Sequence, residues 1–158
     1  MSSAIIDIQC ILGVNNKYFI IEMSIVDTET YSTQHWIFKH SNTLQDKKSK
    51  SVNKWLENHF HGLALDSGHV EYKELVYILN TLKFDTVYVK GEQKRQIINE
   101  ILSYVKIVNL EDLGCPRLNE VCDAETLPCS ITHKDLNPKQ CTFFKVFALR
   151  KWFLNNYL

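Results

Sequence analysis

The chain opens with three apolar, β-branched runs, joined by connections that leave no room for a helix between them. The runs occupy residues 4–12, 18–26 and 34–39. Such runs, bounded by turn residues such as Gly13 and Asn15, predict strands. Strands that follow each other after short connections usually pair antiparallel. The N-terminal part therefore predicts a three-stranded antiparallel meander.

Beyond the meander, helical and strand-like segments alternate. Polar, lysine-rich residues 42–51 predict a loop, and a short helix over 52–59 is expected to bury Trp55. Further helices are expected at 71–82, with Val76 inward, at 92–104, from 117 to about 122 and from 138 onward; strands are expected at 86–90 and 106–110. Helical crossovers imply parallel pairing. The order fits a single α/β domain over residues 1–158, with a ribonuclease H-like mixed sheet (three antiparallel strands, then parallel strands) flanked by helices.

Composition and charge exclude several classes of protein. Lysine plus arginine and aspartate plus glutamate both number 18, so no overall charge marks a nucleic-acid or membrane binder. No segment approaches the roughly 20 apolar residues of a membrane span, and the first residues do not resemble a signal peptide. Five cysteines without a secretion signal favour a reduced, intracellular chain, in the cytoplasm or the nucleus. We expect neither a membrane nor a small-molecule substrate as a partner of this chain.

A Cys-x3-His-x7-Cys cluster lies before the last helix. Its residues are Cys129, His133 and Cys141, and their sulfur and nitrogen atoms suit tetrahedral zinc. Asn137 and Pro138 predict a helix start that puts Cys141 in the first turn. A fourth ligand is not obvious nearby. Buried cysteines that simply pack in the core are the alternative.

The first strand carries Asp7-Ile8-Gln9, where metal-dependent exonucleases of the ribonuclease H-like class have Asp-x-Glu. Two magnesium ions held by carboxylates activate water in such enzymes. Gln9 is an amide, and the segment 88–95 carries lysines where a second acid is expected. A two-metal exonuclease is therefore not expected, and Asp7 is interpreted as a relic or as a cap of a turn.

The chain resembles the Maelstrom domain, a ribonuclease H-like relative of proofreading exonucleases known from the piRNA transposon-silencing pathway. The resemblance rests on residues 21–26, on the Cys129–Cys141 cluster and on the apolar run 141–153, with 87–91 and 109–113 in similar positions. It implies one structural Zn²⁺ bound by Glu22, Cys129, His133 and Cys141. A salt bridge is the alternative role for Glu22, since an unpaired buried carboxylate is unfavourable.

The resemblance also implies binding of single-stranded RNA in a silencing role. Phosphate contacts are expected from six basic residues: Lys47, Lys48, Lys50, Lys90, Lys94 and Arg95. Tyr31, Trp36 or Tyr88 are candidates for base stacking. The alternatives are that Lys90, Lys94 and Arg95 form the solvated side of a helix, that the domain is a protein-interaction module, or that it is a weak single-strand RNA nuclease of a non-metal type.

Overall fold

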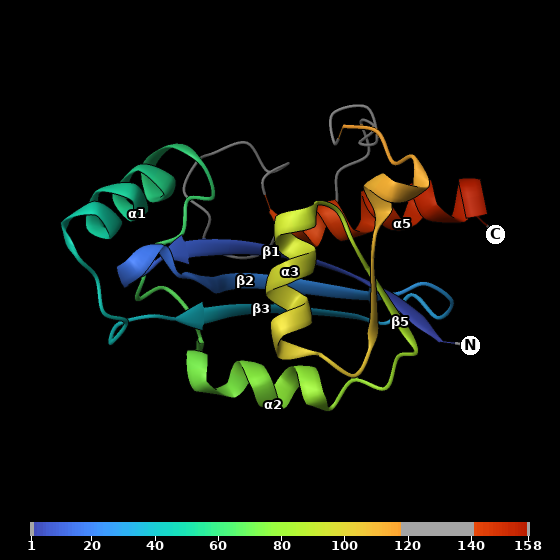
Figure 1. The fold of residues 1–158 in the computed structure, drawn as a ribbon, viewed down its shortest axis with the longest axis horizontal. Coiled ribbons are helices and arrows are strands. Elements are labelled where there is room, and N and C mark those ends of the chain that lie inside the picture. Colours follow the sequence, from blue (N-terminus) through green and yellow to red (C-terminus); the bar gives the residue numbers. More distant parts are fainter. Residues whose placement is uncertain (1, 118–140, 158) are drawn as a thin grey trace.

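A six-stranded mixed sheet forms the centre of the molecule (Figure 1). The computed structural model describes residues 2–117 and 141–157. Across the sheet the order is β4-β3-β2-β1-β5-β6. The strands are β1 (Ser3–Leu12), β2 (Tyr18–Asp27), β3 (Thr33–Lys39), β4 (Val70–Glu71), β5 (Thr86–Val89) and β6 (Lys106–Asn109). β1, β2 and β3 pair antiparallel, whereas β5 pairs parallel with β1 and β6. The predicted meander and the predicted parallel pairing are both confirmed.

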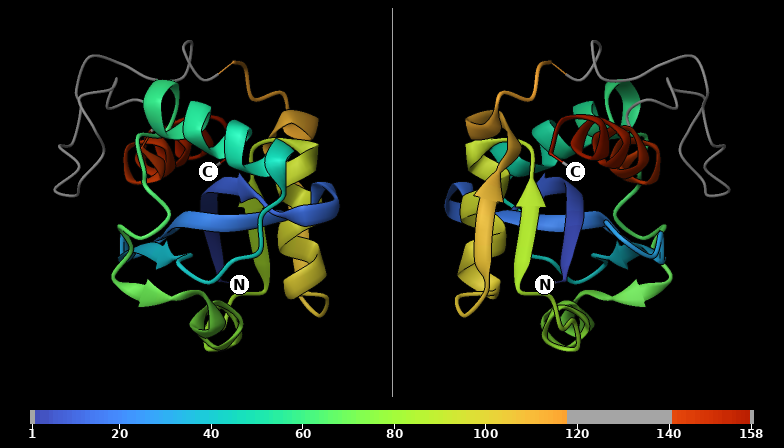
Figure 2. Two further views of the ribbon diagram at one scale, coloured as in Figure 1. Left: turned by 90° about the vertical axis from the view of Figure 1, so that its left-hand side faces the viewer. Right: turned by 90° about the vertical axis from the view of Figure 1, so that its right-hand side faces the viewer.

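Helices cover both faces of this sheet. They are α1 (Lys47–His59), α2 (Leu75–Asn80), α3 (Glu92–Ile101) and α5 (Thr142–Tyr157), with 3-10 turns η1 (Val14–Asn16), η2 (Tyr72–Glu74) and η3 (Leu110–Leu113). α1 and α5 lie on one face, and α2 and α3 lie toward the other (Figures 1 and 2). In the part of the chain that the structure describes, no helix combines the length and the apolar character needed to cross a bilayer.

Alternation along β1 divides its side chains between the two faces. Ile6 and Ile8 pack with α2 and α3 in the larger apolar cluster, whereas Ile5 packs with α5. Asp7 and Gln9 share the α5 face with Ile5, because successive strand residues point to opposite sides. Both polar side chains are buried. The layer between the sheet and α5 therefore has a polar centre.

β2 contains a bulge opposite the second half of β1. Gln9 pairs with Glu22 and Cys10 pairs with Ile20, so Ile21 is the extra residue. A bulge shifts the alternation of side chains by one position. Ile20 consequently packs in the α2–α3 cluster, whereas Ile21 packs in a small cluster with Ile11 on the opposite face.

Helix α1 starts earlier than predicted. Asp46 accepts a hydrogen bond from the Ser49 backbone N–H and the Asp46 N–H donates to the Ser49 hydroxyl, both at 2.8 Å, which forms a capping box. Lys47 therefore begins a helix and is not part of a loop. The buried side of α1 carries Asn53, whose amide exchanges two hydrogen bonds with the Leu12 backbone. Trp55, predicted to be buried, is 56% exposed because α1 attaches to the sheet through these polar contacts.

The segment 71–82, predicted to be one helix, also differs from that prediction in the structure. Its beginning forms β4 and η2, and α2 starts at Leu75, which leaves Val76 54% exposed. A Cβ atom on Gly68 would lie 2.3 Å from the Phe38 backbone, so only glycine allows this segment to approach β3 closely. The close approach lets Val70 pair with Phe38 and adds a sixth strand.

Candidate metal centre

Glu22 lies directly after the bulge of β2 and has no exposed surface. Its Oε2 atom lies 2.7 Å from Nε2 of His35 and 3.4 Å from Sγ of Cys141. Its Oε1 atom accepts a hydrogen bond of 3.1 Å from the backbone N–H of Thr142. Burying a carboxylate is unfavourable unless donors or cations surround it. These contacts make Glu22 the meeting point of β2, β3 and the start of α5.

His35 reaches this site from β3. Its strand neighbour on β2 is Ser24, two residues from Glu22, so the side chains of His35 and Glu22 both face α5. The His35 ring stacks on Phe143 of α5, with centroids 5.2 Å apart and planes inclined by 23°. Beside it, the hydroxyls of Ser24 and Thr142 are 2.7 Å apart. The imidazole is therefore held in a fixed orientation next to the Glu22 carboxylate.

Cys141 completes the cluster at the start of α5. One ligand atom each from Glu22, His35 and Cys141 lies within 4.8 Å of the others. Oxygen, imidazole nitrogen and sulfur are the three ligand types that zinc takes in proteins, usually in a tetrahedral set of four. The chemistry of these residues thus fits a zinc ion, and the geometry is that of a cluster that could hold a metal ion.

Two of the four ligands predicted from the sequence come together here. Glu22 and Cys141 are adjacent in space although they are 119 residues apart. Cys129 and His133 lie outside the described residues, as do Cys122 and the predicted helix start at 137–138. The sequence reasoning missed His35, which it treated only as part of a strand. The register of β2 and β3 was the signal that could have found it.

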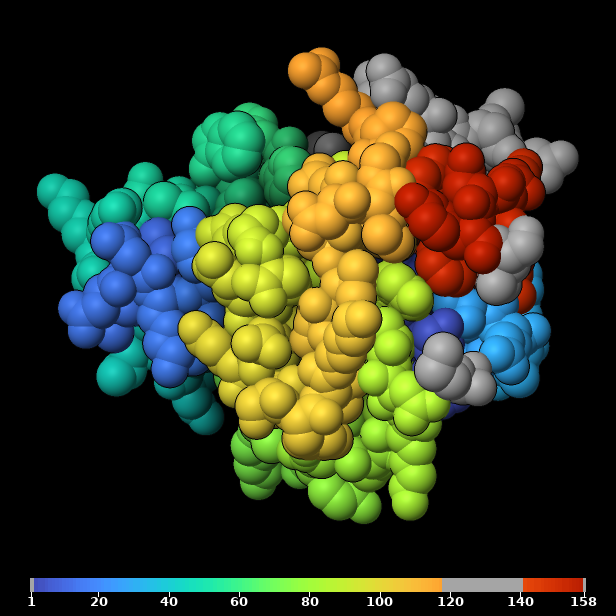
Figure 3. All heavy atoms as spheres, turned by 45° about the vertical axis from the view of Figure 1, so that its right-hand side comes forward, coloured from blue at the N-terminus to red at the C-terminus, as the bar shows by residue number. Residues whose placement is uncertain are grey.

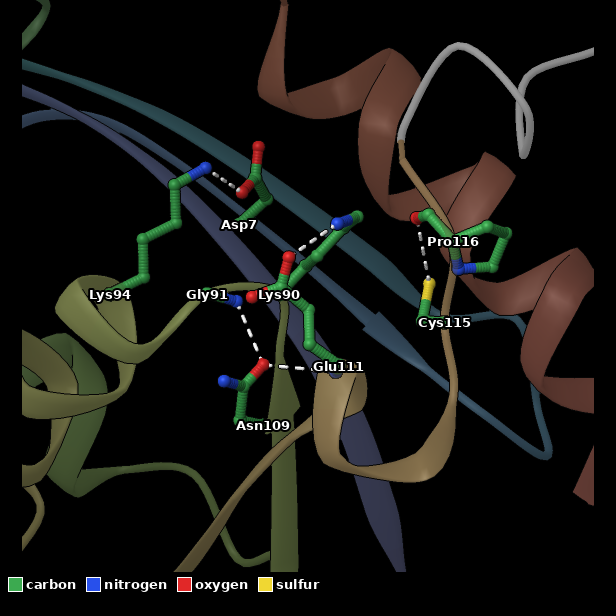
Figure 4. A network of polar contacts seen from close by, with 8 residues as sticks. All are labelled: Asp7, Lys90, Gly91, Lys94, Asn109, Glu111, Cys115 and Pro116. Carbon is green, nitrogen blue, oxygen red and sulfur yellow. Dashed lines mark hydrogen bonds and ion pairs between the residues drawn. The ribbon is translucent and has the colours of Figure 1, made fainter.

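Asp7, which the sequence analysis compared with a carboxylate of the exonucleases, contacts a lysine (Figure 4). Lys94 Nζ lies 2.6 Å from Asp7 Oδ1, and Asp7 is 1% exposed. β1 pairs with β5 only near its start, so the first turn of α3 comes alongside β1 at Asp7. Lys145 of α5 is also buried in this region, and burial lowers its pKa. Asp7 is therefore paired with the ammonium group of Lys94, and position 9 carries an amide in place of a second carboxylate.

The predicted phosphate-binding residues fall into two groups. Lys90 Nζ is 2.8 Å from Glu111, Lys94 contacts Asp7, and Arg95 forms an ion pair with Glu92. Lys47, Lys48 and Lys50 are exposed at the start of α1, and Lys48 donates to Asn16 Oδ1 at 2.7 Å. Within residues 2–117 and 141–157, none of these three α1 lysines forms an ion pair.

The three candidate stacking residues all have aromatic neighbours. Tyr31 stacks on Phe147 at 5.2 Å, Trp36 stacks on His69 at 6.2 Å, and Tyr88 packs on Phe153 at 4.6 Å between ring centroids.

The sequence also predicts that His59 and His61 form a surface pair and that Cys115 is a core or exposed thiol. His61, expected at the surface with His59, is buried, and its Nδ1 accepts a hydrogen bond from Leu63. Cys115, expected to be a core or exposed thiol, is buried. Burial raises the pKa of Cys115, and it raises the pKa of Cys10 to about 12. These two thiols are therefore poor nucleophiles at neutral pH.

No protein-family model and no curated protein matches this sequence.

Proposed function

We propose that this chain is a Maelstrom-like domain that is stabilised by one zinc ion, has lost exonuclease chemistry and binds single-stranded RNA, in a transposon-silencing type of role. The observation that carries the proposal is the convergence of Glu22 and Cys141 in one buried cluster. The Maelstrom resemblance requires these two residues, distant in sequence, to be adjacent. The cluster also contains His35, whose ring nitrogen is a third ligand atom.

The sheet supports the ribonuclease H-like part of the proposal. Three antiparallel strands are followed, on the far side of β1, by two parallel strands reached through helical crossovers. This is the order expected for that fold. The short strand β4 is an addition at the opposite edge and leaves the order of the other five unchanged.

Zinc would act as a structural ion in this proposal. Glu22 and Cys141 would hold it together with Cys129 and His133, and His35 would either replace one of these ligands or orient Glu22. The ion would fasten β2 and β3 to the start of α5. Closing so long a loop in the chain restricts the unfolded state, so metal binding would contribute directly to folding.

The loss of exonuclease chemistry is supported by the contacts of Asp7. Hydrolysis by two metal ions needs carboxylates that hold the ions close together. Lys94 supplies a positive charge to Asp7 directly, and Gln9 has no negative charge. A purified sample that cleaves RNA should lose that activity in Asp7→Ala only if this site is responsible; unchanged cleavage would indicate another site or a contaminant.

RNA binding is best supported at the start of α1. Among the described residues, Lys47, Lys48 and Lys50 form no ion pair, although Lys48 acts electrostatically on Asp46, whereas Lys90, Lys94 and Arg95 each form one. A phosphate must displace an existing partner to reach a paired lysine, but it meets an unpaired one directly. We therefore assign the main phosphate contacts to the α1 lysines.

The test compares two triple variants with the same change in charge. Replacing Lys47, Lys48 and Lys50 by alanine should weaken binding of a single-stranded RNA oligomer and reduce the slope of log affinity against log salt by about 2. The control replaces Lys39, Lys73 and Lys83, which are also exposed. The proposal fails if wild-type protein binds no RNA at low salt, or if both variants lose affinity equally.

One observation favours the alternative, a protein-interaction module. β4 pairs only with Phe38 and Lys39, which leaves residues 33–36 of β3, on the edge away from β2, without a second neighbouring strand in the described part of the chain. An open strand edge can accept an extended peptide. Failure of RNA binding at low salt, together with capture of a defined extended peptide at β3, would favour this second function.

A further inference from the structure

A cavity of about 380 Å³ opens where β1, β5 and β6 begin and α5 ends. Its lining includes Ser3 at the start of β1 and Tyr157 at the end of α5. β5, β6 and the end of α5 meet on the face seen in Figure 3. A volume of this size lies within the range of about 300–1,000 Å³ that is usual for small-ligand sites. The cavity is separate from the metal centre, because it contains none of the three residues of that cluster.

Aromatic rings form one wall of this cavity. Tyr88 and Phe153 have ring centroids 4.6 Å apart, and Phe153 and Tyr157 are 5.9 Å apart with planes inclined by only 16°. The Tyr157 hydroxyl donates a hydrogen bond to the carbonyl oxygen of Leu113, which holds the ring in place. Tyr157 is nevertheless 45% exposed, so an incoming planar group has access to its ring.

Polar side chains supply the rest of the recognition chemistry. Lys106, Glu29 and Tyr88 also line the cavity. In the described part of the chain, no ion pair involves Lys106 or Glu29, and no hydrogen bond involves the Tyr88 hydroxyl. A cation, an anion and a hydroxyl beside stacked rings match a ligand that combines a planar heterocycle, donor groups and a phosphate.

We propose that this cavity binds one nucleotide of single-stranded RNA, with its base on the Tyr157 ring. Lys106 contacts the phosphate, and Glu29 accepts a hydrogen bond from an amino or hydroxyl group of the nucleotide. Base stacking on an aromatic side chain tolerates every base, so the cavity confers little sequence preference. The inference rests on the proposed RNA-binding function and adds a base-binding site to it.

The cavity and the start of α1 lie near opposite ends of β1, which defines a path for the bound RNA strand across the molecule. Ser3 begins β1, and the Leu12 backbone at the other end of β1 contacts α1 through Asn53. Ten residues of extended strand separate the two ends by roughly 30 Å. An oligomer that spans this length contacts both the cavity and the α1 lysines, whereas a shorter one contacts only one of them.

The experiment measures binding of oligouridylate that carries 4-thiouridine, by fluorescence anisotropy and by photocrosslinking. Tyr157→Ala should reduce affinity about tenfold, and Tyr157→Phe, which keeps the ring, should retain it. The control is Tyr77→Ala, which removes another exposed tyrosine from α2. Crosslinks should map to Tyr157 or Tyr88, and Lys106→Ala should reduce the salt slope by about 0.7.

Each failure has a distinct signature. If wild-type protein binds RNA and the α1 triple variant weakens that binding, but Tyr157→Ala binds like Tyr77→Ala and no crosslink maps to the cavity, the base-binding site is wrong and the proposed function stands. If wild-type protein binds no RNA at low salt, the proposed function and this inference fail together.

Discussion

Glu22 is a fully buried carboxylate in the polar layer between the sheet and α5. It has no exposed surface, and it contacts an imidazole, a thiol and a backbone N–H. Removing its charge leaves those donors buried without an ionised acceptor. The same side chain is the metal ligand that the Maelstrom resemblance implies, so its substitution separates a metal site from a simple polar contact.

Glu22→Gln is expected to lower the free energy of unfolding by about 3 kcal/mol, the usual size of the effect when one member of a buried charged contact is lost. Zinc content per chain, measured by mass spectrometry of metals, should fall as well. Glu74→Gln is the control because that carboxylate is exposed. A variant that loses stability but keeps its full zinc content would show that Glu22 forms only a salt bridge.

Lys94 and Arg95 are neighbours on α3 with very different carboxylate partners. Asp7 is 1% exposed, whereas Glu92 lies at the surface beside Arg95. We expect Lys94→Ala to destabilise the fold by about 3 kcal/mol, because it strands a buried charge. Arg95→Ala should change stability by less than about 1 kcal/mol. Denaturant unfolding of both variants, with Lys94→Ala/Asp7→Asn as a partial rescue, checks this; equal effects of the two single variants would contradict it.

At the scale of elements, the five longer strands were predictable, but β4 and the start of α1 were not. Residues 4–12 and 18–26 are β-branched and bounded by turns, which is a local signal. The cap of α1 uses Ser49 in place of the Glu or Gln usual at that position, so the lysines after Asp46 resembled a loop. β4 has only two residues and therefore carries no periodicity from which it could be predicted.

The cap of α1 predicts a dependence of stability on pH. The hydrogen bond from the Ser49 backbone N–H holds the pKa of Asp46 below its usual value. Because the pKa is lower in the folded state, the cap stabilises the fold above the unfolded pKa of about 3.9 and loses this contribution as pH falls. Wild-type protein should therefore lose stability more steeply on acidification than Asp46→Asn, which keeps the acceptor but does not titrate. Parallel pH curves for the two proteins would refute this role of Asp46.

For the whole molecule, the sequence identified part of the candidate metal centre, namely Glu22 and Cys141, and the structure added His35. Glu22 and Cys141 came from a resemblance, because no local pattern links two residues so far apart in sequence. His35 depends on how β2 and β3 are aligned, and alignment between strands cannot be read from composition. The same limit explains Lys94, which looks like a surface lysine until α3 is placed beside β1.

Metal removal tests the stability of the molecule as a whole. A chelator should lower the melting temperature of wild-type protein, and added zinc should restore it, because the ion would connect β2 and β3 to α5. His35→Ala should reduce this difference if the imidazole binds the ion. Calorimetry with and without chelator measures both quantities. Purified protein that lacks zinc, or that melts unchanged after verified removal of zinc, would contradict the proposal.

The extra residue in β2 allows this site to tolerate one particular change in chain length. Glu22 faces α5, while Ile20 faces α2 and α3, because Ile21 interrupts the alternation between them. Deletion of Ile21 would make Ile20 and Glu22 consecutive residues of a regular strand, so both side chains would keep their sides of the sheet and only the packing of Ile21 against Ile11 would be lost. Relatives that keep this centre are therefore expected to have either the present number of residues between Gly13 and Glu22 or one residue fewer.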